Sequence, residues 1–156
     1  MRDFISARVH AIPPSGIRKF FDIAQTMKDV ISLGVGEPDF ATPWCVCEAS
    51  IYSIEQGSTA YTSNKGTPRL RGAISRYLAD RFGIRYDAND EIVVTCGVSE
   101  AADIAIRAVV DPGDEVLVAE PCYVSYTPCV SLAGGVPVTV PCRAEDEFRL
   151  TADALA

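Results

Sequence analysis

The second half of the chain alternates apolar runs of strand length with segments of helical periodicity. Residues 92–95, 116–119 and 136–140 each predict a short strand, and residues 99–110 and 123–132 between them predict helices. This order favours an α/β fold with a partial doubly wound, mostly parallel sheet and right-handed crossovers. Ligands of such sheets bind at the carboxyl ends of the strands.

The N-terminal part predicts an arm followed by a helix. Residues 1–14 contain two adjacent prolines and little periodicity, which favours an extended arm. Ser15 is suited to cap a helix over 17–28, and a short apolar run at 30–33 predicts a strand.

Two further helices share the same start and stop signals. Thr42-Pro43 and Thr67-Pro68 each place a capping hydroxyl before a proline at the expected first helical position. Gly57 and Gly83 provide the left-handed exits. The polar segment between these helices is expected to be a loop with Tyr61 near its centre.

The composition suits a soluble globular domain with its own apolar core, since 48% of the 156 residues are hydrophobic and 22% are charged. The net charge of −7 repels phosphate backbones and anionic membranes, which argues against nucleic-acid and membrane partners. No apolar run approaches the roughly 18 residues of a membrane span. The N-terminus lacks a signal-peptide pattern, so a cytoplasmic protein is expected. The six cysteines form no CxxC cluster and are expected to be buried thiols, with no metal site.

Two segments at the carboxyl ends of predicted strands could bind a ligand. Gly97 and Ser99 lie where a strand passes into a helix, and such a helix start can hold a phosphate or carboxylate. The alternative is that Ser99 merely caps its own helix. Tyr123 follows the next strand, where it could stack on a flat ligand or pack on the surface with a hydrated hydroxyl.

Other potential sites have less support. Gly34 and Gly36 are not followed by the pattern of a dinucleotide-binding loop. The single histidine, His10, lies in the expected arm, which argues against histidine-based acid or base catalysis.

Five sequence segments stand in order along the chain: 32–40 with Thr42-Pro43, Tyr61-Thr62 with 66–71, 95–101, 111–116 and 121–123. In this order and with this spacing, they resemble the class I/II aminotransferases of pyridoxal 5′-phosphate (PLP) fold type I, and particularly their aspartate aminotransferase-like branch. The resemblance covers nearly the whole chain. It implies an arm and the start of a small domain over 1–43, and the N-terminal part of the PLP-binding large domain over 44–156.

The resemblance also implies roles for particular residues. Val98 and Ser99 would bind the PLP phosphate through backbone N–H groups and a hydroxyl. Tyr123 would stack on the pyridine ring. Tyr61 would reach the phosphate in the other subunit of a homodimer. The backbone of Gly36 would contact the α-carboxylate of the substrate.

The implied activity is amino-group transfer between an amino acid and a 2-oxo acid. In the family, the Schiff-base lysine lies beyond the region that matches residues 1–156, and neither Lys19, Lys28 nor Lys65 matches it. No catalytic residue is therefore assigned, and the 156-residue chain alone is expected to be inactive. Two alternatives stay open: a noncatalytic binding or dimerisation module derived from this family, and an unrelated phosphate-binding α/β domain.

Overall fold

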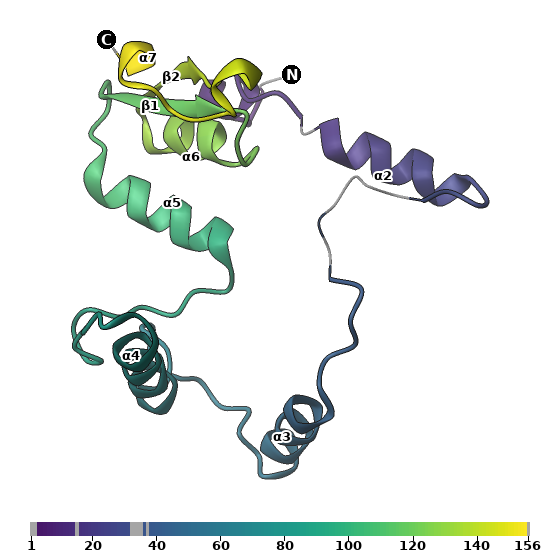
Figure 1. Cartoon of the computed structure of the whole chain (residues 1–156), viewed down its shortest axis with the longest axis vertical. Coiled ribbons are helices and arrows are strands. Elements are labelled where there is room, and N and C mark those ends of the chain that lie inside the picture. Colours follow the sequence, from purple (N-terminus) through teal and green to yellow (C-terminus); the bar gives the residue numbers. More distant parts are fainter. Residues whose placement is uncertain (1–2, 15, 32–35, 37, 156) are drawn as a thin grey trace. The chain divides into compact units, whose positions relative to one another are not determined.

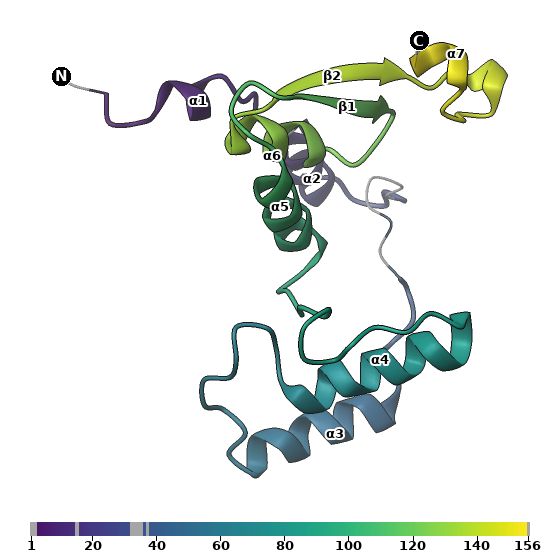
Figure 2. The same cartoon turned by 90° about the vertical axis from the view of Figure 1, so that its left-hand side faces the viewer.

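The structure is a computed structural model that describes residues 3–14, 16–31, 36 and 38–155. Figure 1 and Figure 2 together label its α-helices and strands. In chain order they are α1 (Ala7–His10), α2 (Gly16–Thr26), α3 (Trp44–Glu55), α4 (Pro68–Phe82), α5 (Val98–Val109), β1 (Glu115–Glu120), α6 (Tyr126–Ala133), β2 (Val136–Pro141), a 3-10 turn (Ala144–Asp146) and α7 (Ala152–Leu155).

The chain forms two compact units. One comprises Val30–Thr95, and the other combines the residues up to Asp29 with those from Cys96 onward. The domain boundary expected at residue 43 stays a prediction.

The unit that includes the residues from Cys96 onward contains a parallel strand pair covered by a helix. β1 pairs with β2 in parallel, from Glu115 opposite Val136 to Glu120 opposite Pro141. The intervening α6 contacts both strands, and both views place it against one face of the pair (Figure 1 and Figure 2). The fold is therefore α/β, with the parallel crossover that the alternating pattern predicts. A wider doubly wound sheet stays a prediction.

Apolar side chains hold this layer together. Val118 of β1 and Val140 of β2 are buried, as are Cys129 and Val130 of α6. Two arginines add polar contacts, because Arg8 of α1 and Arg107 of α5 both donate to the carbonyl of Leu132 near the end of α6.

The strand expected over 92–95 is not formed. Among the described residues, the only hydrogen-bonded strand pair is β1 with β2. The backbone N–H of Val94 donates to the carbonyl of Lys65, 3.0 Å away in a loop. A strand requires a partner strand, so the apolar run at 92–95 is insufficient by itself. Similarly, Val30 and Ile31 form no strand, and residues 32 and 33 lie outside the described part.

Two helix starts also differ from the expectation. The helix expected from residue 123 begins at Tyr126, so that Pro128 falls within its first turn, where proline is tolerated. The first residue of α3 is Trp44 and its N-cap is Pro43, with no side-chain cap. The expectation that Thr42 caps this helix, with Pro43 as its first residue, is therefore wrong.

α4 begins and ends where the sequence predicts. Thr67 accepts a hydrogen bond from the N–H of Leu70 at 3.3 Å, Pro68 is the first helical residue, and Gly83 ends the helix with a φ of +70°. The local rules suffice here because each contact joins residues only a few positions apart.

The apolar core is smaller than the composition suggests. The buried apolar residues of the described part are Ile92, Val118, Cys129, Val130 and Val140. Of the six cysteines only Cys129 is buried, so the expectation of six buried thiols is wrong. Burial raises the pKa of the Cys129 thiol. No described helix has the length and apolar character required to cross a membrane.

Candidate functional site

The start of α5 is not capped by Ser99. The N-cap is Gly97, whose φ of 164° is extended, and Ser99 is the second residue of the helix. The Ser99 hydroxyl lies 2.7 Å from the phenolic oxygen of Tyr123. The alternative that Ser99 only caps its own helix is therefore wrong, because its hydroxyl has a partner 24 positions away.

Tyr123 follows β1 and leads into α6. Its side chain is 44% exposed, and its ring meets that of Tyr126 edge-on, with centroids 5.6 Å apart and an interplanar angle of 86°. Hydrogen bonding to Ser125, and after it to Ser99, lowers the pKa of Tyr123 because these contacts favour the phenolate.

Backbone donors at the start of α5 add to the two hydroxyls. The N–H of Ala101 donates to the carbonyl of Gly97. The N–H groups of Val98 and Ser99 therefore precede the first hydrogen bond of the helix. Val98 is 71% exposed. These N–H groups and the positive end of a twelve-residue helix suit an anion.

The composition of this corner fits a phosphate. Two hydroxyls and several N–H groups can donate hydrogen bonds to the oxygens of a phosphate. Next to these donors, the carboxylate of Glu100 accepts the N–H of Cys96. Sequence reasoning did not identify this contact of Glu100. The signal for it was an acidic residue in the first turn of a helix.

Tyr123 also lines a groove of about 520 Å³. Ile12, Pro13 and Pro14 from the N-terminal segment also line this groove. The prolines expected in the arm therefore lie near an expected binding residue of the same unit.

The other two expected site residues belong to the unit of residues 30–95. Tyr61 is fully exposed, and a Cβ atom added to Gly36 would meet no atom within 4 Å. Ser99 and Tyr123 belong to the other unit. Their roles stay predictions.

Comparison with known proteins gives a consistent assignment. Residues 28–156 match the family described as aminotransferase class I and II. The putative aminotransferase YugH of Bacillus subtilis is 58% identical over 152 residues, which are 97% of this chain and 39% of that protein. An aspartate aminotransferase of Pyrococcus abyssi is 48% identical over 151 residues, again 97% of this chain and 39% of the relative.

Solved structures show the same relationship. The aspartate aminotransferase of Thermus thermophilus with maleate matches with a TM-score of 0.88 and 36% sequence identity, over 99% of this chain and 41% of that one. This chain therefore spans about two fifths of the length of the relatives that it matches, and corresponds to their N-terminal part.

Proposed function

Because the chain belongs to the class I and II aminotransferases, we propose that it carries the phosphate-binding part of a PLP-dependent enzyme that transfers an amino group between an amino acid and a 2-oxo acid. In this proposal the backbone N–H groups of Val98 and Ser99 and the Ser99 hydroxyl hold the cofactor phosphate. The free thiols suit the reducing cytoplasm, which is the compartment that we propose.

The observation that carries the proposal is the 2.7 Å contact between the hydroxyls of Ser99 and Tyr123. It places an aromatic ring beside the start of α5, so that one ligand could contact both the helix end and the ring. A phosphate on a flat heteroaromatic ring needs this combination. Bound PLP supplies an electron sink for reactions at the α-carbon of an amino acid.

Tyr61 and Gly36 complete the proposed site. The side chain of Tyr61 reaches the phosphate in the other subunit of a homodimer, and the backbone of Gly36 binds the substrate α-carboxylate. The full exposure of Tyr61 supports its role, because an exposed aromatic side chain in a polar loop is available to contact another subunit.

The test is binding of pyridoxine 5′-phosphate, which has the ring and phosphate of PLP but no aldehyde to react with lysines. In equilibrium dialysis, Ser99→Ala should weaken its binding about tenfold to a hundredfold, because one charge-assisted hydrogen bond contributes about 1.5–3 kcal/mol. Ser50→Ala is the control, since that hydroxyl donates to the carbonyl of Val46 within α3. Equal affinities of the two variants would contradict the proposal.

A second measurement separates the ring from the phosphate. Tyr123→Ala should weaken binding of pyridoxine 5′-phosphate more than binding of inorganic phosphate, because only the former stacks on an aromatic face. An equal loss for both ligands would remove the stacking role.

Formation of a Schiff base with PLP requires the amine of a lysine, and none of Lys19, Lys28 and Lys65 matches the Schiff-base lysine of the family. We therefore expect the 156-residue chain, without further sequence, to show no transaminase activity and no specific Schiff base with PLP. Borohydride reduction followed by peptide mapping measures this. Labelling of one specific lysine, together with turnover of amino acids, would contradict the expectation.

A further inference from the structure

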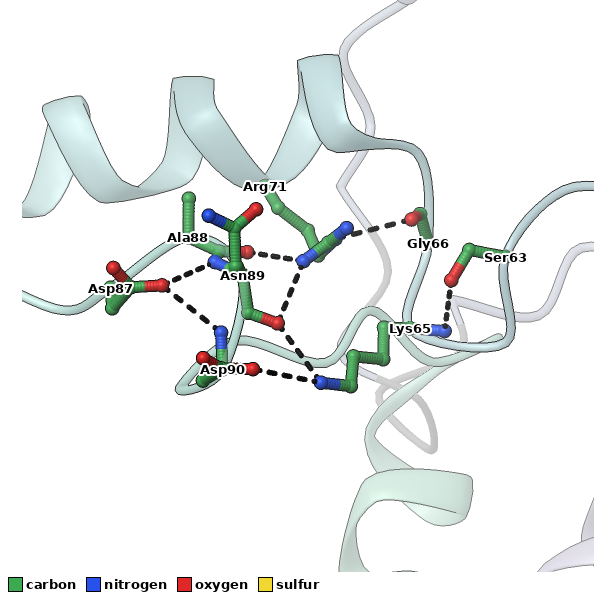
Figure 3. A network of polar contacts seen from close by, with 8 residues as sticks. All are labelled: Ser63, Lys65, Gly66, Arg71, Asp87, Ala88, Asn89 and Asp90. Carbon is green, nitrogen blue, oxygen red and sulfur yellow. Dashed lines mark hydrogen bonds and ion pairs between the residues drawn. The ribbon is translucent and has the colours of Figure 1, made fainter.

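Arg71 is the one charged side chain that is buried among the residues that the structure describes, with 6% of its surface exposed. It projects from α4 towards two separate backbone segments, as Figure 3 shows. Its Nε donates to the carbonyl of Gly66 at 3.2 Å, and its Nη1 donates to the carbonyls of Ala88 and of Asn89, the latter at 3.1 Å.

These partners are neutral backbone oxygens from both sides of α4. The guanidinium is planar and carries five donors in a fixed fork, so it can hold carbonyls from two segments at once. A lysine has a single ammonium nitrogen on a flexible chain and cannot reproduce this geometry. The contacts of Arg71 therefore define the path of the backbone on both sides.

Other contacts hold the same corner. The ammonium of Lys65 donates to the carbonyl of Asn89 at 3.0 Å and lies 3.4 Å from a carboxylate oxygen of Asp90. The carbonyl of Lys65 accepts the N–H of Val94. Gly66, with a φ of +91°, packs so closely that an added Cβ atom would lie 2.7 Å from the Cβ atom of Val94.

Lys65 and Gly66, whose backbone carbonyls accept these hydrogen bonds, form the C-terminal end of the polar loop 58–66 that contains Tyr61. Tyr61 is fully exposed and its ring makes no described packing contact that could fix it. We infer that Arg71 is a positioning residue, which anchors the C-terminal end of loop 58–66 and so fixes where the loop presents Tyr61. The importance of this loop for cofactor binding rests on the proposed function, but the anchoring itself does not.

Hydrogen exchange of the 156-residue chain tests the anchor without cofactor or activity. In Arg71→Lys, exchange of the Gly66 and Val94 amides should accelerate at least about tenfold, whereas amides in the middle of α4 should change much less. Arg69→Lys is the matched control, because Arg69 is an exposed arginine in the same helix. Unchanged exchange at the two amides, or equal acceleration throughout α4, would overturn the inference.

A fluorescent probe tests the link to Tyr61. Trp44 is the single tryptophan, so Tyr61→Trp in a Trp44→Phe background reports on the loop alone. Adding Arg71→Lys should make the decay of local anisotropy faster, while adding Arg69→Lys should leave it unchanged. Identical decays in both proteins would show that Arg71 does not position residue 61. Failure of Tyr61→Phe to affect binding of pyridoxine 5′-phosphate would instead refute the proposed role of Tyr61.

Discussion

The two compact units differ in the kind of side chain that lies at the centre of their contacts. In the unit of residues 30–95, the guanidinium of Arg71 lies among backbone carbonyls beside the tightly packed Gly66. In the other unit, α6 places Val130 against two strands in which Val118 and Val140 are buried. The first arrangement depends on donor geometry and close backbone approach, and the second depends on the area of apolar surface removed from water.

Similar apolar runs in the two units are therefore stabilised by different contacts. A strand pair is stabilised by a covering helix, because alternate side chains of both strands point to one face. The apolar run at 92–95 is not part of a strand, and its Val94 amide donates to the carbonyl of Lys65 in the loop that Arg71 anchors.

The largest effect is expected where backbone approach is closest. Gly66→Ala should lower the free energy of unfolding by about 2–4 kcal/mol, because it combines a left-handed φ with overpacking against Val94. Gly57→Ala is the matched control: its φ is +72° but nothing lies within 4 Å, so only the conformational cost of about 1–2 kcal/mol is expected. Urea denaturation measures both. Equal losses would mean that close packing at Gly66 is unimportant.

The apolar layer is tested by shortening its most buried side chain. Val130 is 1% exposed, and Val130→Ala should cost about 2–3 kcal/mol through lost burial and the cavity that remains. Val136→Ala in β2 is the control, because that side chain is 47% exposed and its loss should cost well under 1 kcal/mol. A loss for Val130→Ala no larger than that of the control would show that this layer is not packed as described.

A smaller effect should separate α3 from α4. Thr67→Ala should cost about 1 kcal/mol, since it removes the side-chain cap that accepts the N–H of Leu70. Thr42→Ala should cost less, because α3 begins after Pro43 without a side-chain cap. Thermal unfolding of the two variants, followed by circular dichroism, makes the comparison. A larger loss for Thr42→Ala would contradict the described helix starts.

The smallest expected effect concerns the pKa of Tyr123. It is lowered by Ser125 and then by Ser99, so removing either hydroxyl should raise it towards the ordinary value. Because the folded-state pKa lies below the unfolded one, ionisation of Tyr123 stabilises the fold only in alkaline solution. That contribution is lost as the pH falls through the lowered pKa.

Spectrophotometric titration, with Tyr123→Phe subtracted to isolate one phenol from six, measures the shift. An unchanged titration in both Ser99→Ala and Ser125→Ala would show that the hydroxyls do not contact the phenolate in solution.

Much of the local structure follows from the sequence. The β1 and β2 strands and the α4 and α5 helices lie within a residue or two of their predicted ends. The predicted membership of the aminotransferase family is confirmed by the match over residues 28–156. Of the site, the sequence predicted that Ser99 and Tyr123 lie near the same sheet edge, and the structure joins their hydroxyls. The binding roles of Val98, Ser99, Tyr123, Tyr61 and Gly36 stay predictions.

What the sequence determined by itself was therefore local: turns, caps, helical periods, and the ordered motifs that identify the family. These signals act between residues a few positions apart, so they can be evaluated without knowing the fold. Three outcomes emerged only in the folded chain: Arg71 is buried while Arg69 is exposed, residues 92–95 lie outside the strands of the described part, and Ser99 bonds to Tyr123 rather than capping its helix. Each of these outcomes depends on which distant segment supplies a donor, an acceptor or an apolar surface, and chain folding brings such segments together.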